Sequence, residues 1–197
     1  LSSLSPELVT PKLQTAILQT EKVCPNMHLV LQSGSNAVLQ KMRRRYSQED
    51  FLAIVQNLRQ KKPEFTFSTD IIVGFPGETE KDFEDTLQVI KAAHFVRAHV
   101  FPFSARSHTR AALFADDVPE EEKKSRKRVL KQLCYETAFA WRQKFVGRKE
   151  EILLEANNFG YTRNFLPVRL QAAALQANQL LTVNLIENNN SELIACP

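Results

Sequence analysis

The chain has 197 residues, of which 43% are hydrophobic and 24% are charged, and this length suits one good-sized domain or one domain with a small module. No apolar run approaches the ~18 residues of a membrane span, so we expect no membrane contact, and three scattered cysteines, Cys24, Cys134 and Cys196, exclude a disulfide framework or a self-contained metal site and indicate the cytoplasm. The net charge of +4 comes from basic segments at 1–62 and 120–150, which permit a nucleic-acid partner without proving one.

The start of the chain predicts helices around one short strand. Proline follows a capping residue at Ser5 and at Thr10, which is typical of helix starts. Residues 27–31 read as an apolar strand that runs into a polar turn at 32–35. Ser35 can cap the helix that follows this turn.

A basic run at 41–45 stands before the next helix. Ser47 and Asp50 form a capping box, and apolar residues then recur at helical spacing. We interpret the basic run as a solvated helix junction, with a phosphate contact as the alternative.

The segment 69–79, T-D-I-I-V-G-F-P-G-E-T, is the centre of the pattern. It ends an expected strand at 65–75, and Gly74, Pro76 and Gly77 cut the apolar run just before a helix begins. This pattern is typical of a buried parallel strand that is connected to the N-terminus of a helix by a tight turn. The glycines allow the backbone to approach a ligand closely, and the N–H groups at the helix start can hold an anionic or polar group.

The alternation of strand and helix continues with a strand at 95–103 and the longest helix at 119–146. A spacing of roughly 30–35 residues predicts an α/β fold with a mostly parallel sheet of βα units, too few to close a barrel. Polar motifs follow the strands at 32–35, 74–78 and 104–106. Polar clusters at the carboxyl ends of strands are how α/β enzymes build their active sites.

The C-terminal quarter of the chain has a different pattern. Short strand-like runs at 151–155, 165–170 and 180–185 alternate with polar turns and lack amphipathic helices. They predict a small antiparallel β-barrel. We therefore divide the chain into an α/β domain at 1–143 and a barrel module at 144–197.

Several motifs in combination resemble the radical SAM methylthiotransferases. They are H-L-V-L-Q-S-G-S at 28–35 with V-L-Q-K-M-R-R-R-Y at 38–46, the segment 70–79, and F-P-F-S-A-R at 101–106 followed by Thr109, Ala111 and Ala112. In addition, G-Y-T-R-N-F at 160–165 resembles the TRAM module of this family, a small RNA-binding β-barrel. Within the family, H-V-F-P-F-S at 99–104 is most similar to the branch that acts on threonylcarbamoyladenosine in tRNA.

The resemblance implies both a fold and a reaction. The fold would be the C-terminal part of a radical SAM partial (β/α) barrel followed by a TRAM-like barrel. The reaction would add a methylthio group at C2 of N6-threonylcarbamoyladenosine next to the anticodon, with S-adenosyl-L-methionine (SAM) and [4Fe–4S] clusters as cofactors. The expected macromolecular partner is the anticodon stem-loop of a tRNA in the cytoplasm.

The resemblance also implies a SAM site at the ends of the strands. Its expected residues are Gln32, Ser33, Ser35, Thr69, Asp70, Gly74, Phe75, Pro76, Gly77, Glu78 and Arg106. Arg106 belongs to an F-S-A-R motif where the family has Y-S-P-R. No catalytic residue is assigned.

We expect RNA contacts from basic residues of the long helix and the linker, and from residues of the barrel. These are Lys123, Lys124, Lys127, Arg128, Lys144, Arg148, Lys149, Tyr161, Arg163 and Phe165. The two aromatic residues would stack on bases, and the basic residues would neutralise phosphates.

The chain departs from the family pattern because it has no C-x3-C-x2-C loop to hold a radical SAM cluster. We therefore expect a C-terminal fragment, inactive alone, whose clusters belong to a missing N-terminal half. Leu1 in place of an initiating Met agrees with this expectation.

Three alternatives remain open. The chain is a non-catalytic RNA-binding paralogue, a methylthiotransferase of the isopentenyladenosine branch, or an unrelated α/β hydrolase or synthase. The four histidines, His28, His94, His99 and His108, are expected to be structural or surface residues rather than ligands.

Overall fold

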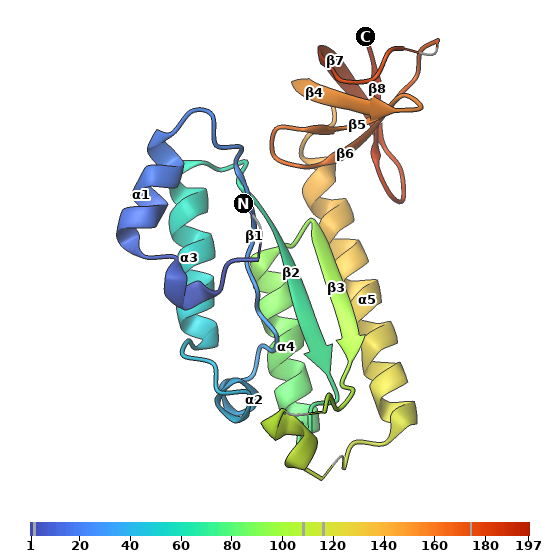
Figure 1. Cartoon of the computed structure of the whole chain (residues 1–197). Helices are drawn as coiled ribbons and strands as arrows, with labels where there is room; N and C mark the ends of the chain where they lie inside the picture. Colours follow the sequence, from blue (N-terminus) through green and yellow to red (C-terminus); the bar gives the residue numbers. More distant parts are fainter. Residues whose placement is uncertain (2, 108, 116, 174) are drawn as a thin grey trace.

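The computed structural model describes residues 1, 3–107, 109–115, 117–173 and 175–197, so His108 lies outside the described residues. The chain forms a small sheet with helices packed against it and, after a long helix, a closed barrel (Figure 1). Within the described ranges, no helix is both long enough and apolar enough to cross a membrane.

The sheet is parallel, and its three strands lie in the order β1-β2-β3. The strands are β1 (Asn26–His28), β2 (Thr66–Val73) and β3 (Arg97–Pro102). Ser68 stands in register with both His28 and Arg97. Asp70 stands in register with His99 on the neighbouring strand. The predicted alternation of parallel strands and helices is confirmed, although β1 is shorter than the strand expected at 27–31.

Of the seven helices that the structure describes, four begin at a residue whose side chain caps the first turn, and three begin without a side-chain cap. The helices are η1 (Pro6–Leu8), α1 (Pro11–Gln19), α2 (Asn36–Lys41), α3 (Gln48–Lys61), α4 (Glu80–Ala93), η2 (Arg110–Leu113) and α5 (Glu120–Gln143). Ser35 accepts a hydrogen bond from a backbone N–H at the start of α2, and both Ser47 and Thr79 form the predicted capping boxes. A cap of this kind contributes about 1 kcal/mol to helix stability.

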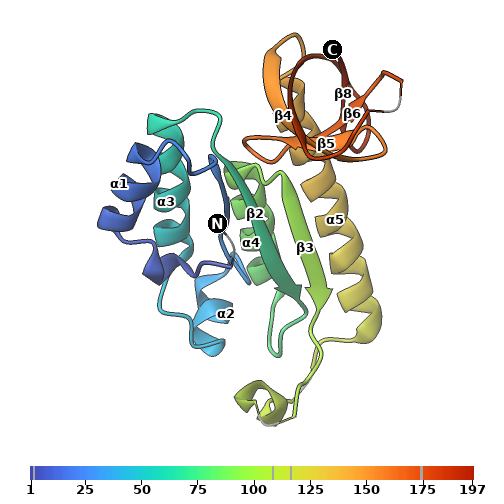
Figure 2. The ribbon, with the colours of Figure 1, turned by 45° about the horizontal axis from the view of Figure 1, so that its top comes forward.

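The helices cover one face of the sheet and leave the other face open. Figure 2 shows α4 behind β2 and β3 and α5 alongside β3, with no helix in front of these two strands. Alternate residues of β2 point to the two faces of the sheet. Ile71 and Val73 face the helices and are fully buried in the main core with Phe51 and Phe83, whereas Asp70 faces the open side and lines cavities. The open face therefore carries the polar side chains of the sheet.

The barrel closes through five strands in the order β4-β5-β6-β8-β7. They are β4 (Lys149–Ala156), β5 (Phe159–Thr162), β6 (Pro167–Leu170), β7 (Gln179–Asn188) and β8 (Leu193–Cys196). The barrel is confirmed, but the expectation that it is antiparallel throughout is wrong for one pair, because β6 and β8 run parallel. An odd number of strands cannot alternate in direction around a closed ring, so one neighbouring pair must be parallel.

Helix α5 joins the sheet to the barrel. It runs along β3, and its last turns carry Trp141 into the core of the barrel, where Phe145 follows. Arg59 of α3 packs against this junction, with its guanidinium carbon 4.0 Å from the centroid of the Trp141 ring. Helix α5 ends at Gln143, and the first strand of the barrel begins at Lys149.

Candidate functional site

Two cavities lie along the open face of the sheet. The barrel-side cavity, of about 970 Å³, is lined by the sheet residues His28 and Arg97 and by Tyr161 of the barrel, among others. The strand-end cavity, of about 940 Å³, lies at the carboxyl ends of the strands. Asp70 lines both cavities, so they adjoin along β2.

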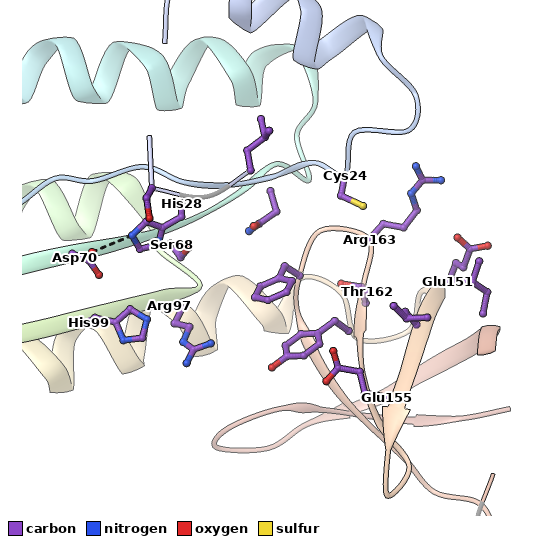
Figure 3. A pocket seen from close by; sticks show the side chains of 17 residues that line it. Cys24, His28, Ser68, Asp70, Arg97, His99, Glu151, Glu155, Thr162 and Arg163 are labelled. Carbon is purple, nitrogen blue, oxygen red and sulfur yellow. Dashed lines mark hydrogen bonds and ion pairs between the residues drawn. The ribbon is translucent and has the colours of Figure 1, made fainter. Parts of the chain in front are cut away.

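The sheet wall of the barrel-side cavity is a row of polar side chains (Figure 3). The Nε2 atom of His28 lies 3.3 Å from Oδ2 of Asp70, and its Nδ1 atom lies 3.0 Å from the hydroxyl of Ser68. The ring of His99 lies 6.4 Å from the ring of His28, and Arg97 stands two positions before His99 on β3. This wall offers both hydrogen-bond donors and acceptors to a ligand.

The opposite wall of this cavity is aromatic. The rings of Tyr161 and Phe165 stack with their centroids 4.4 Å apart and an angle of 5° between their planes, and Phe159 meets Tyr161 edge-on at 5.1 Å. Phe165 is 39% exposed and has a φ of 65°. A left-handed backbone is unusual for an aromatic residue and is one form of the strain that clusters at functional sites.

The loop between β5 and β6 holds the aromatic wall against the sheet. Asn164 is buried, and its Nδ2 donates a hydrogen bond to the carbonyl of Glu64 at 3.1 Å. The hydroxyl of Thr66 donates to the carbonyl oxygen of Asn164. Arg163 reaches the carbonyl of Glu21 at 2.8 Å. Three contacts from one tight loop thus fix the position of the barrel beside β2.

The strand-end cavity combines aromatic rings with cations. Phe75 packs edge-on against Phe103 at 5.2 Å and against Phe114 at 6.1 Å. Arg44 also lines this cavity, and its buried Nε atom has no hydrogen-bond partner among the described residues. A buried donor without a partner is costly, and the Arg44 guanidinium is the only group of this cavity with such an atom among the described residues.

The structure brings four of the predicted SAM residues together and places the others elsewhere. Those that line the strand-end cavity are Gln32, Asp70, Phe75 and Arg106. Those that do not line it are Ser33, Ser35, Thr69, Gly74, Pro76, Gly77 and Glu78. Thr69, for example, is fully buried and accepts a hydrogen bond from the backbone N–H of Leu31.

The turn after β2 is held by structural contacts. The carboxylate of Glu78 is buried, accepts a hydrogen bond from the N–H of Gly74, and pairs with Arg126 of α5 at 2.8 Å. Burial opposes the charge on Arg126, but the carboxylates of Glu78 and Glu122 outweigh it and raise its pKa. A side chain at Gly74 would come within 2.3 Å of Cγ of Lys123. Gly74 is therefore needed for close packing against α5.

Nine of the ten predicted RNA-binding residues fall into three groups. Tyr161, Arg163 and Phe165 line the barrel-side cavity, whereas Lys124, Lys127 and Arg128 line a separate groove between α4 and α5. The remaining exposed residues, Lys144, Arg148 and Lys149, lie at the junction and line neither. Lys123 is 1% exposed and pairs with Glu120, so it does not present its charge on the surface as we expected.

Sequence reasoning missed the importance of the open face. It took His28 and His99 for structural or surface residues and did not single out Arg97, although all three line the barrel-side cavity. The signal was present in β3, where Arg97, His99 and Phe101 alternate with smaller or buried residues. That alternation marks one face of a strand.

Comparison with known proteins relates the chain to radical SAM proteins and to tRNA methylthiotransferases. Residues 6–90 match the model of the Radical SAM superfamily. Over 155 residues the chain is 43% identical to the threonylcarbamoyladenosine tRNA methylthiotransferase MtaB of Chlamydia pneumoniae, covering 79% of this chain and 37% of that protein. It is also 38% identical over 195 residues to a tRNA-2-methylthio-N(6)-dimethylallyladenosine synthase of Clostridium novyi, covering 95% of this chain and 43% of that protein.

A second MtaB protein, from Thermotoga maritima, is 40% identical over 155 residues, which are 79% of this chain and 36% of that protein. The resemblance to radical SAM methylthiotransferases is thereby confirmed. The chain spans only between 36% and 43% of the length of these three relatives.

Proposed function

With residues 6–90 placed in the radical SAM superfamily, we propose that this chain is the C-terminal portion of a tRNA methylthiotransferase that acts on N6-threonylcarbamoyladenosine next to the anticodon. The observation that carries the proposal is the contact between the two cavities at Asp70. A cofactor in the strand-end cavity would then face a base that enters beside the aromatic wall. The division into a catalytic domain at 1–143 and a TRAM-like module at 144–197 belongs to this proposal.

Relatives of two substrate branches resemble this chain to similar degrees. We favour the threonylcarbamoyladenosine branch because of the H-V-F-P-F-S segment at 99–104, which contributes His99 to the barrel-side cavity and Phe103 to the strand-end cavity. The isopentenyladenosine branch is the second candidate.

The residues of the strand-end cavity fit SAM. Its volume suits a ligand of that size, and Phe75 and Phe103 offer flat apolar surfaces for an adenine. Arg44, with its unpartnered Nε, and Arg106 can bind a carboxylate through charged hydrogen bonds. SAM, when bound, supplies the radical and the methyl group, while these side chains orient it and exclude water.

The described residues do not fit an iron–sulfur cluster. Cys24 is exposed beside the barrel-side cavity, Cys134 is buried in the main core, and Cys196 lies in β8. Burial raises the pKa of Cys134 to about 12, which disfavours the thiolate that a cluster needs. We therefore assign the clusters to a segment of the protein outside this chain, which would be its obligatory partner.

The barrel supports an RNA partner. Five-stranded barrels that bind oligonucleotides use the face of their second and third strands, and these correspond to β5 and β6 here. Tyr161 and Phe165 lie on this side and can stack on an unpaired base. Because the proposed substrate is tRNA, the proposed place of the reaction is the cytoplasm.

Mass spectrometry of tRNA nucleosides tests this proposal. Deleting the gene for the full-length protein should abolish 2-methylthio-N6-threonylcarbamoyladenosine and leave its precursor in place. Loss of the dimethylallyl product instead would favour the second branch. An unchanged nucleoside profile would favour a non-catalytic RNA-binding paralogue, for which the lack of cluster ligands in this chain is the supporting observation.

A further inference from the structure

Two side chains of β3 face the barrel-side cavity with their hydrogen-bonding groups available. Arg97 is exposed, and within the part of the chain that the structure describes it forms no hydrogen bond or ion pair. His99 contacts its neighbours through its ring, which lies 6.4 Å from His28 and 6.4 Å from Phe101. A guanidinium and an imidazole two positions apart on one strand point to the same face of the sheet (Figure 3).

None of the acidic side chains that line this cavity forms an ion pair with Arg97 or His99 among the described residues. Asp70 stands beside His99 in register, but it is paired with His28 at 3.3 Å. The other two carboxylates in the lining, Glu151 and Glu155, belong to β4 on the barrel wall. On the β3 wall, the exposed Arg97 guanidinium is the group that can receive an anion.

The size and the remaining walls of the cavity suit a modified nucleoside. A volume of about 970 Å³ lies within the range of small-ligand sites. Tyr161 and Phe165 provide an aromatic surface for a base on one side, and Ser68 offers a hydroxyl on the other. The Arg97 guanidinium can bind a carboxylate through two parallel hydrogen bonds.

We propose that Arg97 and His99 bind the carboxylate of the amino-acid group on N6 of the substrate adenosine and thereby select the substrate branch. This inference rests on the proposed function. A threonylcarbamoyl group carries a carboxylate, a hydroxyl and a urea, whereas a dimethylallyl group carries no polar atom. A site built to hydrogen-bond its ligand rejects an analogue that leaves its polar groups unpaired.

Binding of anticodon stem-loops to the full-length protein tests the inference without catalysis. The probes are three stem-loops of one sequence whose adenosine carries threonylcarbamoyl, the methyl ester of threonylcarbamoyl, or dimethylallyl. The variants are Arg97→Gln, Arg97→Lys and His99→Asn, with Lys12→Gln in α1 as an exposed control that lines none of these cavities. Circular dichroism and thermal unfolding verify that each variant is folded.

The wild type should bind the free carboxylate at least about tenfold more tightly than the ester, as expected for a charged hydrogen bond. Arg97→Gln should reduce this ratio to about one and leave the affinity for the dimethylallyl stem-loop unchanged. Arg97→Lys should restore part of the ratio, and His99→Asn should lower it. Lys12→Gln should change neither affinity.

Equal weakening of all three stem-loops by Arg97→Gln would overturn the inference, since it would show a general phosphate contact. Wild-type protein that binds the acid and the ester equally would overturn it too, while leaving the proposed function intact. If no stem-loop binds, the RNA proposal fails, and titration with the free nucleoside and its ester then decides the inference alone. A lack of preference for the free acid in that titration would refute it.

Discussion

Replacing Arg59 with Met should loosen the junction between the sheet and the barrel. The Arg59 guanidinium donates hydrogen bonds at 3.0, 2.6 and 3.2 Å to the carbonyl oxygens of Phe65, Ala93 and His94. It also lies over the ring of Trp141. Burial lowers the pKa of Arg59 to about 10, so the group remains charged at neutral pH. Met keeps the apolar length of the side chain but leaves these carbonyls without their donor.

The expected loss follows from these contacts. A hydrogen bond from a charged group contributes about 1.5–3 kcal/mol, and a cation over an aromatic ring contributes about 0.5–2 kcal/mol. Such contributions do not add when they share one side chain, and Met regains part of the packing. We therefore expect the free energy of unfolding to fall by about 2–4 kcal/mol in Arg59→Met.

The assay is urea unfolding followed by tryptophan fluorescence. Trp141 is the single tryptophan of the chain, so its emission reports directly on this junction. Arg45→Met is a matched control at an exposed arginine and should change stability by less than about 0.5 kcal/mol. An equally small loss in Arg59→Met, with unchanged emission, would refute the view that Arg59 holds the junction.

Further predictions concern the turn, the junction, the α4–α5 groove and the cluster. Gly74→Ala should lower the free energy of unfolding by about 2–4 kcal/mol in urea titrations, because Gly74 has a φ of 69° and a side chain there would clash with Lys123; a loss below about 0.5 kcal/mol would contradict the packing described. Burial, with Lys144 and Arg59 nearby, lowers the pKa of His94 in the folded protein. As the pH drops below about 6.5, His94 is protonated in the unfolded state before it is protonated in the folded state, so the free energy of unfolding should fall. His94→Asn, which tolerates the left-handed backbone, should flatten this fall in urea midpoints taken at about pH 7.5 and about pH 5.5; an unchanged pH dependence would contradict the assignment. Replacing three cations of the groove, Lys124, Lys127 and Arg128, with Gln should flatten the salt dependence of stem-loop binding if RNA reaches the groove, with a log–log slope change of about 2–3. An unchanged slope would show that the groove is not part of the RNA site. Anaerobic reconstitution of this chain should give no [4Fe–4S] absorbance, and a stoichiometric signal would overturn the assignment of the clusters elsewhere.

Local chemistry in the sequence predicted the sheet and its helices. The capping boxes at Ser47 and Thr79 and the apolar run of β2 are short-range signals, and the structure places these elements close to the expected bounds. The barrel was harder to predict. Strand β5 contains Gly160, which weakens any strand pattern, and the parallel pairing of β8 with β6 depends on closure of the whole ring.

The candidate site was predicted only in part. The motif that ends β2 was correctly associated with a turn. Its residues Glu78 and Gly74, which we expected to contact SAM, instead form an ion pair with Arg126 and pack against α5, respectively. These contacts join segments more than forty residues apart, so no local pattern could reveal them. The same holds for Asn164 of the G-Y-T-R-N-F segment, whose side chain contacts Glu64 beside the sheet.

The most direct test of the central claim is a labelling experiment on the full-length protein. The anaerobically reconstituted protein is incubated with a reductant, a sulfur source, an anticodon stem-loop bearing N6-threonylcarbamoyladenosine, and SAM with a deuterated methyl group. We expect mass spectrometry to find a deuterated methylthio group on this adenosine. We also expect its yield to fall at least about tenfold in Arg44→Met, which removes charged hydrogen-bond donors from the strand-end cavity. An unlabelled adenosine in the wild-type reaction, or full labelling in Arg44→Met, would contradict the account.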